Sequence, residues 1–357
     1  MRKVPGSRYV DVDFLAIEQR RIFERAWLMV GRSAELAGPG DYVAFKVGDV
    51  PVMVLRDQSG TLRAFRNHCR HRGTQLLAEG RGHVKAIRCP YHDWKYALDG
   101  RLRHVPGEEL FEPLDKASLG LHPLRVSEAI GLIWVNASLE GPSLQQTSGD
   151  IFDEVAPYGL GEMTPVHEQW STVPCNWKAL LDNATESYHL TRVHGMTVDK
   201  HVTTRPGFRT YGDHYRLTLP IADYPWREWL DAATGRGGPY TPKQKAELHK
   251  YVLFPNFLMN VLPYHLTIFQ VWPDGPDRCR FFYGFYERRG ARGLEWLRVR
   301  ATWLASRYIL REDLAILMRF QDGVRAGRAD SHRFHDDERA LAHFHDALTR
   351  WTEPEPD

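Results

Sequence analysis

The sequence contains few cysteines, little excess charge and no long apolar run. Among its 357 residues there are four cysteines, and the formal net charge is +2. A nearly neutral chain gives no electrostatic reason to expect nucleic acid or an anionic membrane as a partner. No apolar stretch approaches the ~18 residues that span a bilayer, and the first residues, MRKVPGSRYVDVDF, lack the apolar segment of a signal peptide. We therefore expect a cytoplasmic protein with neither a nucleic-acid nor a membrane partner.

Two short pairs of metal-ligand residues use half of the cysteines. Cys69-x-His71 and Cys89-x-x-His92 are separated by seventeen residues. Two thiolates and two imidazoles are the ligands of a Rieske-type 2Fe-2S cluster, in which cysteines hold one iron and histidines the other. A Cys2His2 zinc site is the alternative, although zinc sites usually pair Cys with Cys and His with His, whereas each pair here is mixed.

The remaining cysteines, Cys175 and Cys279, have no obvious metal partner. A single disulfide between them is one interpretation. Because no secretion signal is visible, we expect free thiols in a reducing compartment.

Periodicity along the chain predicts three helices, with regions of short strands or extended chain between them. Residues 13–27 and 176–192 have helical patterns, and residues 292–323 have a long one. Residues 137–150 are small and polar, which predicts a linker. Residues 231–245, rich in Gly, Pro and Lys, predict a loop within a mostly extended region at 203–290. Short predicted strands lie at 42–47, 52–56, 62–67, 84–88, 96–98 and 132–136.

A second group of possible metal ligands lies in the predicted helix at 176–192. His189 and His194 are five residues apart, so a regular helix would turn them roughly 140° from one another. One metal ion can bind both only if the helix ends between them, and Arg192-Val193 before Gly195 predicts such an end. Two histidines and one carboxylate form the ferrous site of non-haem oxygenases.

These motifs together resemble the α subunit of Rieske non-haem iron oxygenases, the ring-hydroxylating oxygenase family. The matching patterns are C-x-H-x17-C-x2-H and N-W-K followed by D-N-x-x-E-x-Y-H-x4-H. The resemblance implies an α+β fold with a small antiparallel β Rieske domain at 36–137. Residues 1–35 and 138–357 would form a helix-grip catalytic domain with an antiparallel sheet, a long C-terminal helix and a mononuclear iron.

The resemblance also implies roles for individual residues. The cluster ligands would be Cys69, His71, Cys89 and His92. His189 and His194 would hold Fe(II) with an aspartate from an E-D-x7-Q stretch. That stretch makes Asp313 the candidate, with Glu312 as its direct rival and Asp336 and Glu338 as weaker ones.

Glu186 would act as a bridge in such a protein. In the family, an acidic residue at this position hydrogen-bonds the iron ligand of its own chain, here His189, and a cluster ligand of the neighbouring chain, here the partner subunit's His92. Electrons would then cross between subunits, which implies a homotrimer. The alternative is a solvated helix carboxylate.

Asp93 departs from the family pattern, which has glycine after the second histidine. Because Asp tolerates left-handed backbone angles better than most residues, we expect the loop to form.

The resemblance implies O2-dependent hydroxylation or oxidative demethylation of a small organic molecule. Without a G-x-G-x-x-G fingerprint in the sequence, electrons from NADH or NADPH must arrive through a separate reductase or ferredoxin. Glu186, in place of the aspartate of aromatic dihydroxylating members, resembles the subgroup that acts on quaternary ammonium compounds. Aromatic cis-dihydroxylation is the alternative reaction, and a Rieske electron carrier without catalytic iron is the alternative class.

Aromatic residues in the predicted strands are candidates for a substrate wall, which would suit a cation or an arene. Packing in the core is the default interpretation of these residues. They are Tyr251, Phe254, Phe257, Phe269 and Trp272.

Overall fold

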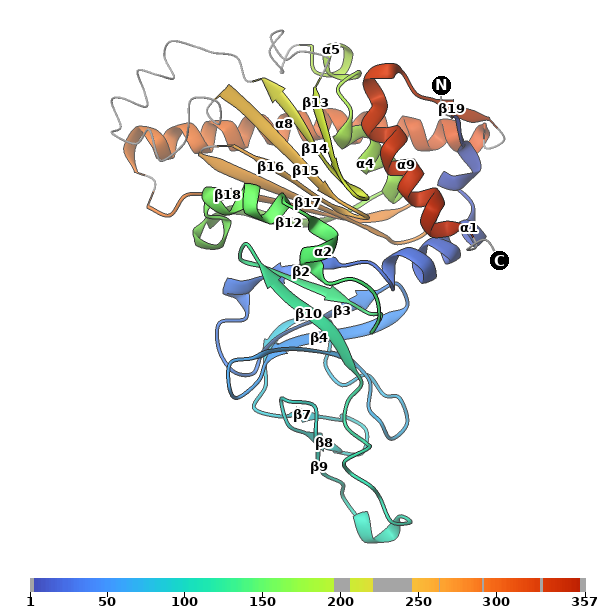
Figure 1. The fold of residues 1–357 in the computed structure, drawn as a ribbon, viewed down its shortest axis with the longest axis vertical. Coiled ribbons are helices and arrows are strands. Elements are labelled where there is room, and N and C mark those ends of the chain that lie inside the picture. The colour runs from blue at the N-terminus through green and yellow to red at the C-terminus, as the bar shows by residue number, and fades with distance from the viewer. Residues whose placement is uncertain are drawn as a thin grey trace. The chain divides into compact units, whose positions relative to one another are not determined.

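The computed structural model describes residues 3–195, 206–220, 246–262, 264–290, 292–327 and 330–353. The chain divides into two compact units (Figure 1). The small unit is Glu18–Gln146, and the large unit combines Met1–Ile17 with Thr147–Asp357. The functional domain limits expected above, 36–137 and the remainder, stay a prediction.

The small unit is built from two antiparallel sheets. A seven-stranded sheet has the order β2-β11-β10-β5-β4-β3-β6, and a three-stranded sheet has the order β7-β8-β9. The bounds are β2 Leu28–Arg32, β3 Asp41–Val47, β4 Val50–Arg56, β5 Leu62–Arg66, β6 Gly80–His83, β7 Ile87–Arg88, β8 Lys95–Tyr96, β9 Leu102–His104, β10 Pro123–Ala129 and β11 Leu132–Asn136.

Most predicted strands of the small unit are present, but four strands had no prediction. The predicted strand at 84–88 is reduced to β7, Ile87–Arg88, and β2, β6, β9 and β10 are additional. The sequence of β6 is GRGH, and all four of its residues are exposed. Such a strand has no apolar alternation, so only its pairing with β3 defines it.

The N-terminal helix is shorter than predicted. Helix α1 spans Val12–Glu18 and continues as a π-helical turn over Gln19–Phe23. Ile22 and Phe23 are fully buried, and the chain then turns toward β2. Residues 24–27 are therefore not helical, which corrects the predicted end at 27.

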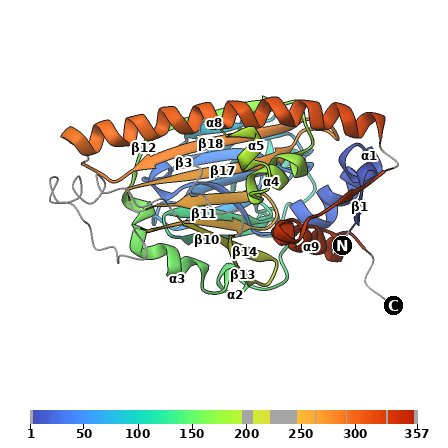
Figure 2. The ribbon, with the colours of Figure 1, turned by 90° about the horizontal axis from the view of Figure 1, so that it is seen from above.

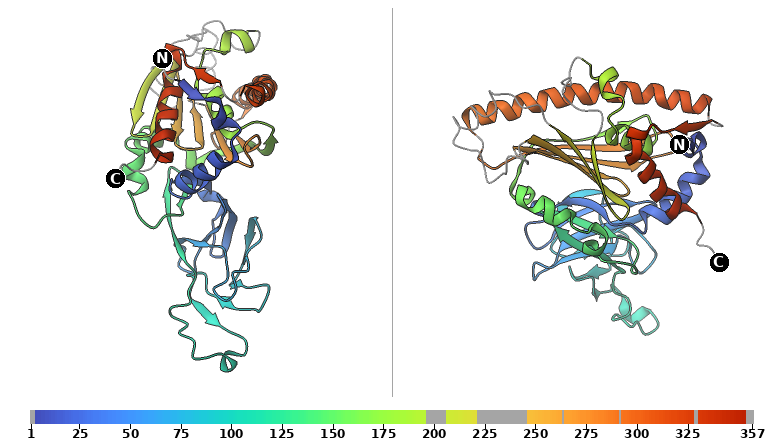
Figure 3. Two further views of the ribbon diagram at one scale, coloured as in Figure 1. Left: turned by 90° about the vertical axis from the view of Figure 1, so that its right-hand side faces the viewer. Right: turned by 45° about the horizontal axis from the view of Figure 1, so that its top comes forward.

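The large unit has a main antiparallel sheet with helices packed on it (Figures 2 and 3). Its seven strands have the order β12-β18-β17-β16-β15-β14-β13. Together with the small unit this confirms the predicted α+β fold with antiparallel sheets and a long helix near the C-terminus. The strand bounds are β12 Thr164–Val173, β13 Gly207–Tyr211, β14 His214–Pro220, β15 Glu247–Leu253, β16 Phe257–Val261, β17 His265–Pro273 and β18 Cys279–Glu287.

Helices and short elements complete the large unit. The predicted helix at 292–323 is α8, Gly293–Ala326, and α9 spans Arg339–Thr352. The predicted linker at 137–150 contains a short helix, α2 (Leu144–Ser148), and α3 (Ile151–Val155) follows it. Strand β1 (Lys3–Pro5) pairs with β19 (Ser331–Arg333). The predicted loop at 231–245 lies outside the described residues.

A buried hydrogen-bond pair fixes α8 against α4, which spans Trp177–Thr185. Asn176 caps α4, since its side chain accepts from the Lys178 backbone N–H at 3.0 Å. The Asn176 backbone N–H donates to Gln321 Oε1 on α8 at 2.8 Å, and Gln321 is fully buried. This contact anchors α8 eight residues beyond Asp313.

Cys175 and Cys279 are both buried free thiols, as predicted. Among the described residues, no helix has the length and apolar character needed to cross a membrane.

Candidate metal centres

The two cysteine-containing loops of the small unit have the same backbone hydrogen bonds. The first follows β5, and the second connects β7 to β8. In each loop the cysteine N–H donates to the carbonyl oxygen five residues later, Thr74 or Trp94, at 2.8 and 2.9 Å. The residue four positions after each cysteine donates back to the cysteine carbonyl at 3.0 Å. The two loops are therefore copies of one turn, and each presents a cysteine and a histidine.

This shared turn explains why Asp93 is tolerated. The residue four positions after the cysteine is Gly73 in the first loop, with φ 75°, and Asp93 in the second, with φ 55°. Both have left-handed backbone angles, which glycine adopts freely and aspartate better than most residues. The Asp93 carboxylate accepts two 3.0 Å hydrogen bonds from Arg88 Nη1. The expectation that the loop forms with aspartate is confirmed.

The side chains of these loops converge on a partly buried cluster of sulfur and imidazole. Cys69 and Cys89 are 2% and 3% exposed. The Tyr96 hydroxyl lies 3.3 Å from Cys69 Sγ, and burial raises the pKa of the Cys69 thiol. The ring centroids of His71 and His92 are 4.7 Å apart.

This arrangement fits a two-iron cluster better than a single zinc ion. His71 Nδ1 is buried, and none of the described residues hydrogen-bonds to it, which is the situation of an imidazole nitrogen that a metal would satisfy. A tetrahedral zinc ion needs all four ligand atoms within roughly 4 Å of one another. In the described part of the chain, only one group of three or more possible ligand residues has its ligand atoms within 4.8 Å of one another. That group is His189, His194 and Asp313, and it includes none of the four residues of the cysteine-containing loops.

The second candidate centre depends on a break in the helical segment. Helix α4 ends at Thr185, and Glu186 is extended, with φ −116° and ψ 170°. A short helix, α5, then spans Leu190–Val193. The predicted continuous helix over 176–192 was therefore wrong, because the chain leaves α4 before His189. The predicted helix end at Arg192-Val193 is confirmed, since α5 ends at Val193. The Glu186 carboxylate accepts from the backbone N–H groups of Tyr188 and His189, which stabilises the break.

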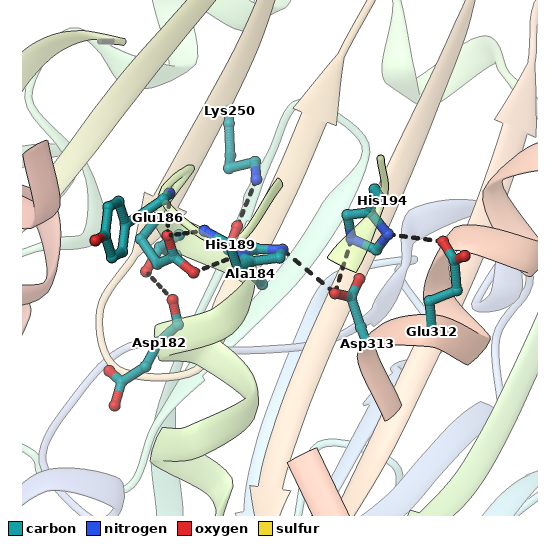
Figure 4. Close-up of polar contacts among 10 residues, drawn as sticks. Asp182, Ala184, Glu186, His189, His194, Lys250, Glu312 and Asp313 are labelled. Carbon is teal, nitrogen blue, oxygen red and sulfur yellow. Dashed lines mark hydrogen bonds and ion pairs between the residues drawn. The ribbon is translucent and has the colours of Figure 1, made fainter. Parts of the chain in front are cut away.

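His189, His194 and Asp313 converge in the large unit (Figure 4). One ligand atom from each lies within 4.8 Å of the other two. Asp313 Oδ1, on α8, is 3.4 Å from His189 Nε2 and 3.0 Å from His194 Nε2. The two imidazole rings are nearly perpendicular, at 72°. Two histidines and one carboxylate in this arrangement are suited to hold ferrous iron with positions left for other ligands.

Each histidine is also held from behind by a second carboxylate. His189 Nδ1 contacts Glu186 Oε1, and His194 Nδ1 lies 2.8 Å from Glu312 Oε2 (Figure 4). A carboxylate on Nδ1 fixes the orientation of the ring, and here both Nε2 atoms lie near Asp313 Oδ1. Glu312, predicted as a rival ligand, is therefore placed outside the ligand set, and sequence reasoning missed its contact with His194.

The carboxylates of this centre favour the protonated form of His189. Burial acts to lower the pKa of His189, but the hydrogen bonds that its ring donates to Asp313 and Glu186 outweigh burial and raise the pKa to about 9. A site that stabilises a proton in this way is also suited to stabilise a cation.

The weaker rivals lie elsewhere. Asp336 and Glu338 form a short 3-10 turn, Asp336–Glu338, before α9. Glu338 Oε2 accepts from the His335 backbone N–H at 2.6 Å. Neither residue belongs to the group of converging ligand atoms.

The three converging residues line a pocket of about 270 Å³ between the sheet, α8 and the segment after α4. Alternate residues of the strands face it, including Lys250 of β15, Asn260 of β16 and Thr267 of β17. The walls contain Leu217, Leu219, Leu248, Leu262, Phe269, Tyr283 and Phe285.

Of the five aromatic residues considered for a substrate wall, the structure places only Phe269 in this pocket. Tyr251 lies on the opposite face of the sheet, where its hydroxyl donates to Glu154 Oε2 at 3.0 Å. Phe254 packs against Phe344 and Trp351. Phe257 and Trp272 do not line the pocket either. Core packing, the default interpretation, applies to Tyr251, Phe254 and Phe257, which are buried, whereas Trp272 is only half-buried.

Family models match both halves of the chain. Residues 26–114 match the model of the Rieske [2Fe-2S] domain, and residues 160–354 match the catalytic domain of the ring-hydroxylating alpha subunit. Fold and motifs together define an iron–sulfur protein with a second, catalytic domain. The chain belongs to the family of ring-hydroxylating alpha subunits, the Rieske oxygenases.

Individual relatives extend the comparison. The glycine betaine monooxygenase oxygenase subunit of Chromohalobacter salexigens is 36% identical over 191 residues, which cover 54% of this chain and 43% of that protein. The matched region is thus less than half of that relative. The carnitine monooxygenase oxygenase subunit of Escherichia coli K12 is 28% identical over 379 aligned positions, covering 97% of this chain and 93% of that protein.

Solved structures show the same fold. A quaternary ammonium Rieske monooxygenase in complex with L-carnitine superposes with a TM-score of 0.81 at 23% identity. The match covers 98% of this chain and 96% of that chain.

Proposed function

We propose that this protein is the terminal oxygenase of a Rieske oxygenase system. It would hydroxylate or oxidatively demethylate a small quaternary ammonium compound, using O2 and electrons that originate from NADH or NADPH. A separate reductase or ferredoxin would deliver the electrons. The observation that carries the proposal is the convergence of His189, His194 and Asp313 within 4.8 Å in the wall of a pocket.

The geometry of both groups supports the ligands that the sequence predicts for them. Cys69, His71, Cys89 and His92 would hold the 2Fe-2S cluster, and the convergent triad would hold Fe(II). When bound, the cluster supplies one-electron transfer and the mononuclear iron supplies reductive activation of O2.

The surrounding residues prepare the iron site for this chemistry. Glu186 and Glu312 orient the two imidazoles, so that little ring movement is needed when the metal binds. The apolar walls of the pocket exclude water from the reacting groups. Lys250, which sequence reasoning missed, lines the same pocket, and its ammonium group donates to the Ala184 carbonyl oxygen (Figure 4).

Assembly and location complete the proposal. Besides contacting His189, Glu186 would hydrogen-bond the partner subunit's His92 in a homotrimer. We propose a cytoplasmic location.

Monooxygenation of a quaternary ammonium compound is favoured by the two relatives, which are named for glycine betaine and carnitine. A Rieske electron carrier needs only the small unit. It does not account for the match of residues 160–354 to a catalytic domain.

Metal analysis tests the proposal directly. The oxygenase should contain about three irons per chain, whereas a carrier should contain about two. A His189→Ala variant should lose one iron and product formation while keeping the visible absorption of the cluster. Full activity in that variant would remove His189 from the site.

A further inference from the structure

Three polar residues form a row across the floor of the pocket. Lys250, Asn260 and Thr267 are direct neighbours on adjacent strands, since Lys250 pairs with Asn260 and Asn260 pairs with Thr267. All three line the pocket. Cross-strand neighbours on one face have Cβ atoms about 5 Å apart, so their polar groups can act on one bound group.

The hydrogen bonds of Asn260 leave part of the row unsatisfied. Asn260 Nδ2 lies 2.9 Å from Thr267 Oγ1, while its Oδ1 is buried and has no hydrogen-bond partner in the described part of the chain. A half-turn of the amide would let the threonine hydroxyl donate to Oδ1 and leave Nδ2 free to donate to a ligand. A buried amide with an unused position in a cavity is expected to have a ligand or water there.

Lys250 is the basic residue of the same row. Burial lowers its pKa, Asp313 and Glu186 oppose that shift, and a carboxylate bound beside the lysine would further favour its charged form. Lys250 Nζ donates to the Ala184 carbonyl oxygen at the end of α4 (Figure 4). Two of the three N–H groups of the ammonium are then available to donate to a ligand. The carboxylates acting on it are Asp313 and Glu186, and both are already engaged by the histidines. No carboxylate of the described residues lies within ion-pair distance of Lys250.

We propose that Lys250, Asn260 and Thr267 bind a carboxylate group of the substrate. The inference rests on the proposed function and narrows its substrate class. Lysine repels a simple quaternary ammonium cation, so this row selects compounds that also carry an acid group. With the acid held on the row, the rest of the molecule extends into the pocket that His189, His194 and Asp313 line.

A purely structural role for Lys250 makes a different prediction. If the lysine only anchors the end of α4 through Ala184, its loss should weaken all ligands alike and disturb the neighbouring Glu186. Binding of matched ligands, with and without the acid group, separates the two roles.

The experiment is anaerobic calorimetry of the iron-loaded protein with two ligand pairs. Glycine betaine is compared with choline, and L-carnitine with its methyl ester. For at least one pair the acid should bind about 10- to 100-fold more tightly than its counterpart, as expected for hydrogen bonds to a charged group. Lys250→Gln, which retains a donor for Ala184, should lose most of this preference without weakening choline binding. Asn260→Leu should reduce the preference in part.

The control variant is Lys46→Gln, an exposed lysine of the small unit, which should keep the preference. Equal weakening of acid and counterpart in Lys250→Gln, or no acid preference in either wild-type pair, would overturn the proposal. The iron content of the same sample tests the oxygenase independently. Three irons without an acid preference would remove only the carboxylate site, and two irons would remove the proposed oxygenase.

Discussion

Glu312 offers the sharpest test of how the mononuclear site is built. Its carboxylate lies 2.8 Å from His194 Nδ1, and the His194 side chain is 1% exposed. In Glu312→Ala, the Nδ1–H loses its partner in a place that water hardly reaches, and the ring is no longer oriented. Loss of such a supporting carboxylate typically lowers metal affinity about 10- to 100-fold, which corresponds to about 1.4–2.8 kcal/mol of binding free energy.

The assay is anaerobic titration of the mononuclear site with Fe(II) in protein that retains its cluster. The visible absorption of the cluster serves as an internal check that the small unit is intact. Glu312→Gln keeps an oxygen acceptor for Nδ1–H, so we expect a smaller loss than in Glu312→Ala. Asp313→Ala removes a ligand and should lower the affinity by more than either variant.

A matched control lies on the same helix. Asp322 is 75% exposed and pairs with Arg325, so Asp322→Ala should leave Fe(II) affinity unchanged. If Glu312→Ala lost as much affinity as Asp313→Ala, the assignment of Glu312 as an orienting residue outside the ligand set would be wrong. If Glu312→Ala bound iron as wild type does, its orienting role would be refuted.

Three further predictions concern other parts of the structure. With its folded pKa near 9 against about 6.5 in the unfolded chain, metal-free His189 should contribute about 3 kcal/mol of stability below pH 6.5. This contribution is lost as pH rises to 9. In urea unfolding, the difference in free energy of unfolding between wild type and His189→Asn should therefore shrink across that pH range. A difference that stays constant with pH would contradict the raised pKa. Gln321→Leu should cost about 2–4 kcal/mol in thermal unfolding, because the buried Asn176 N–H and Tyr9 carbonyl lose their partner; a cost under 1 kcal/mol would show that the bonds are dispensable. Asp93→Ala should lower the free energy of unfolding by about 1–2 kcal/mol, because residue 93 has a positive φ, whereas Asp93→Gly should change it by less than about 1 kcal/mol. Denaturant-induced loss of cluster absorption measures both values. Equal losses in the two variants would refute the backbone argument.

The cluster loops could be predicted from the sequence because all their determinants are local. Each turn closes through hydrogen bonds between residues four or five apart, and Gly73 and Asp93 satisfy the same backbone requirement. The pattern of ligands therefore specifies the loop almost without help from the rest of the fold.

The sequence singled out the three residues that converge, His189, His194 and Asp313, but not the backbone that brings them together. The segment 176–192 has a helical pattern, and nothing in that pattern marks Glu186 as the place where the helix ends. The break is stabilised by the Glu186 side chain, which accepts from two backbone N–H groups and contacts His189. The Glu186 carboxylate thus competes with helical carbonyl groups for backbone N–H donors. The helical pattern of the sequence cannot reveal this competition, because the same carboxylate on a continuous helix would simply face solvent.

The choice between Glu312 and Asp313 required the fold for a related reason. Adjacent helical residues point about 100° apart, so one of them can face the metal-binding nitrogens while the other reaches a different atom. Asp313 lies near both Nε2 atoms, and Glu312 reaches His194 Nδ1. Two neighbouring acids in a motif thus contact different nitrogen atoms, and only the position of α8 shows which acid contacts which.

The pocket shows how register converts an ordinary strand sequence into a binding surface. A one-residue shift would exchange the two faces of β15, placing Tyr251 in the pocket and Lys250 on the far side. The observed register instead aligns Lys250 with Asn260 and Asn260 with Thr267, although the three residues are far from any motif. Each taken alone is an ordinary polar residue of a strand. Their proposed role in carboxylate binding arises from the pairing between strands, so it can be recognised only in the assembled sheet.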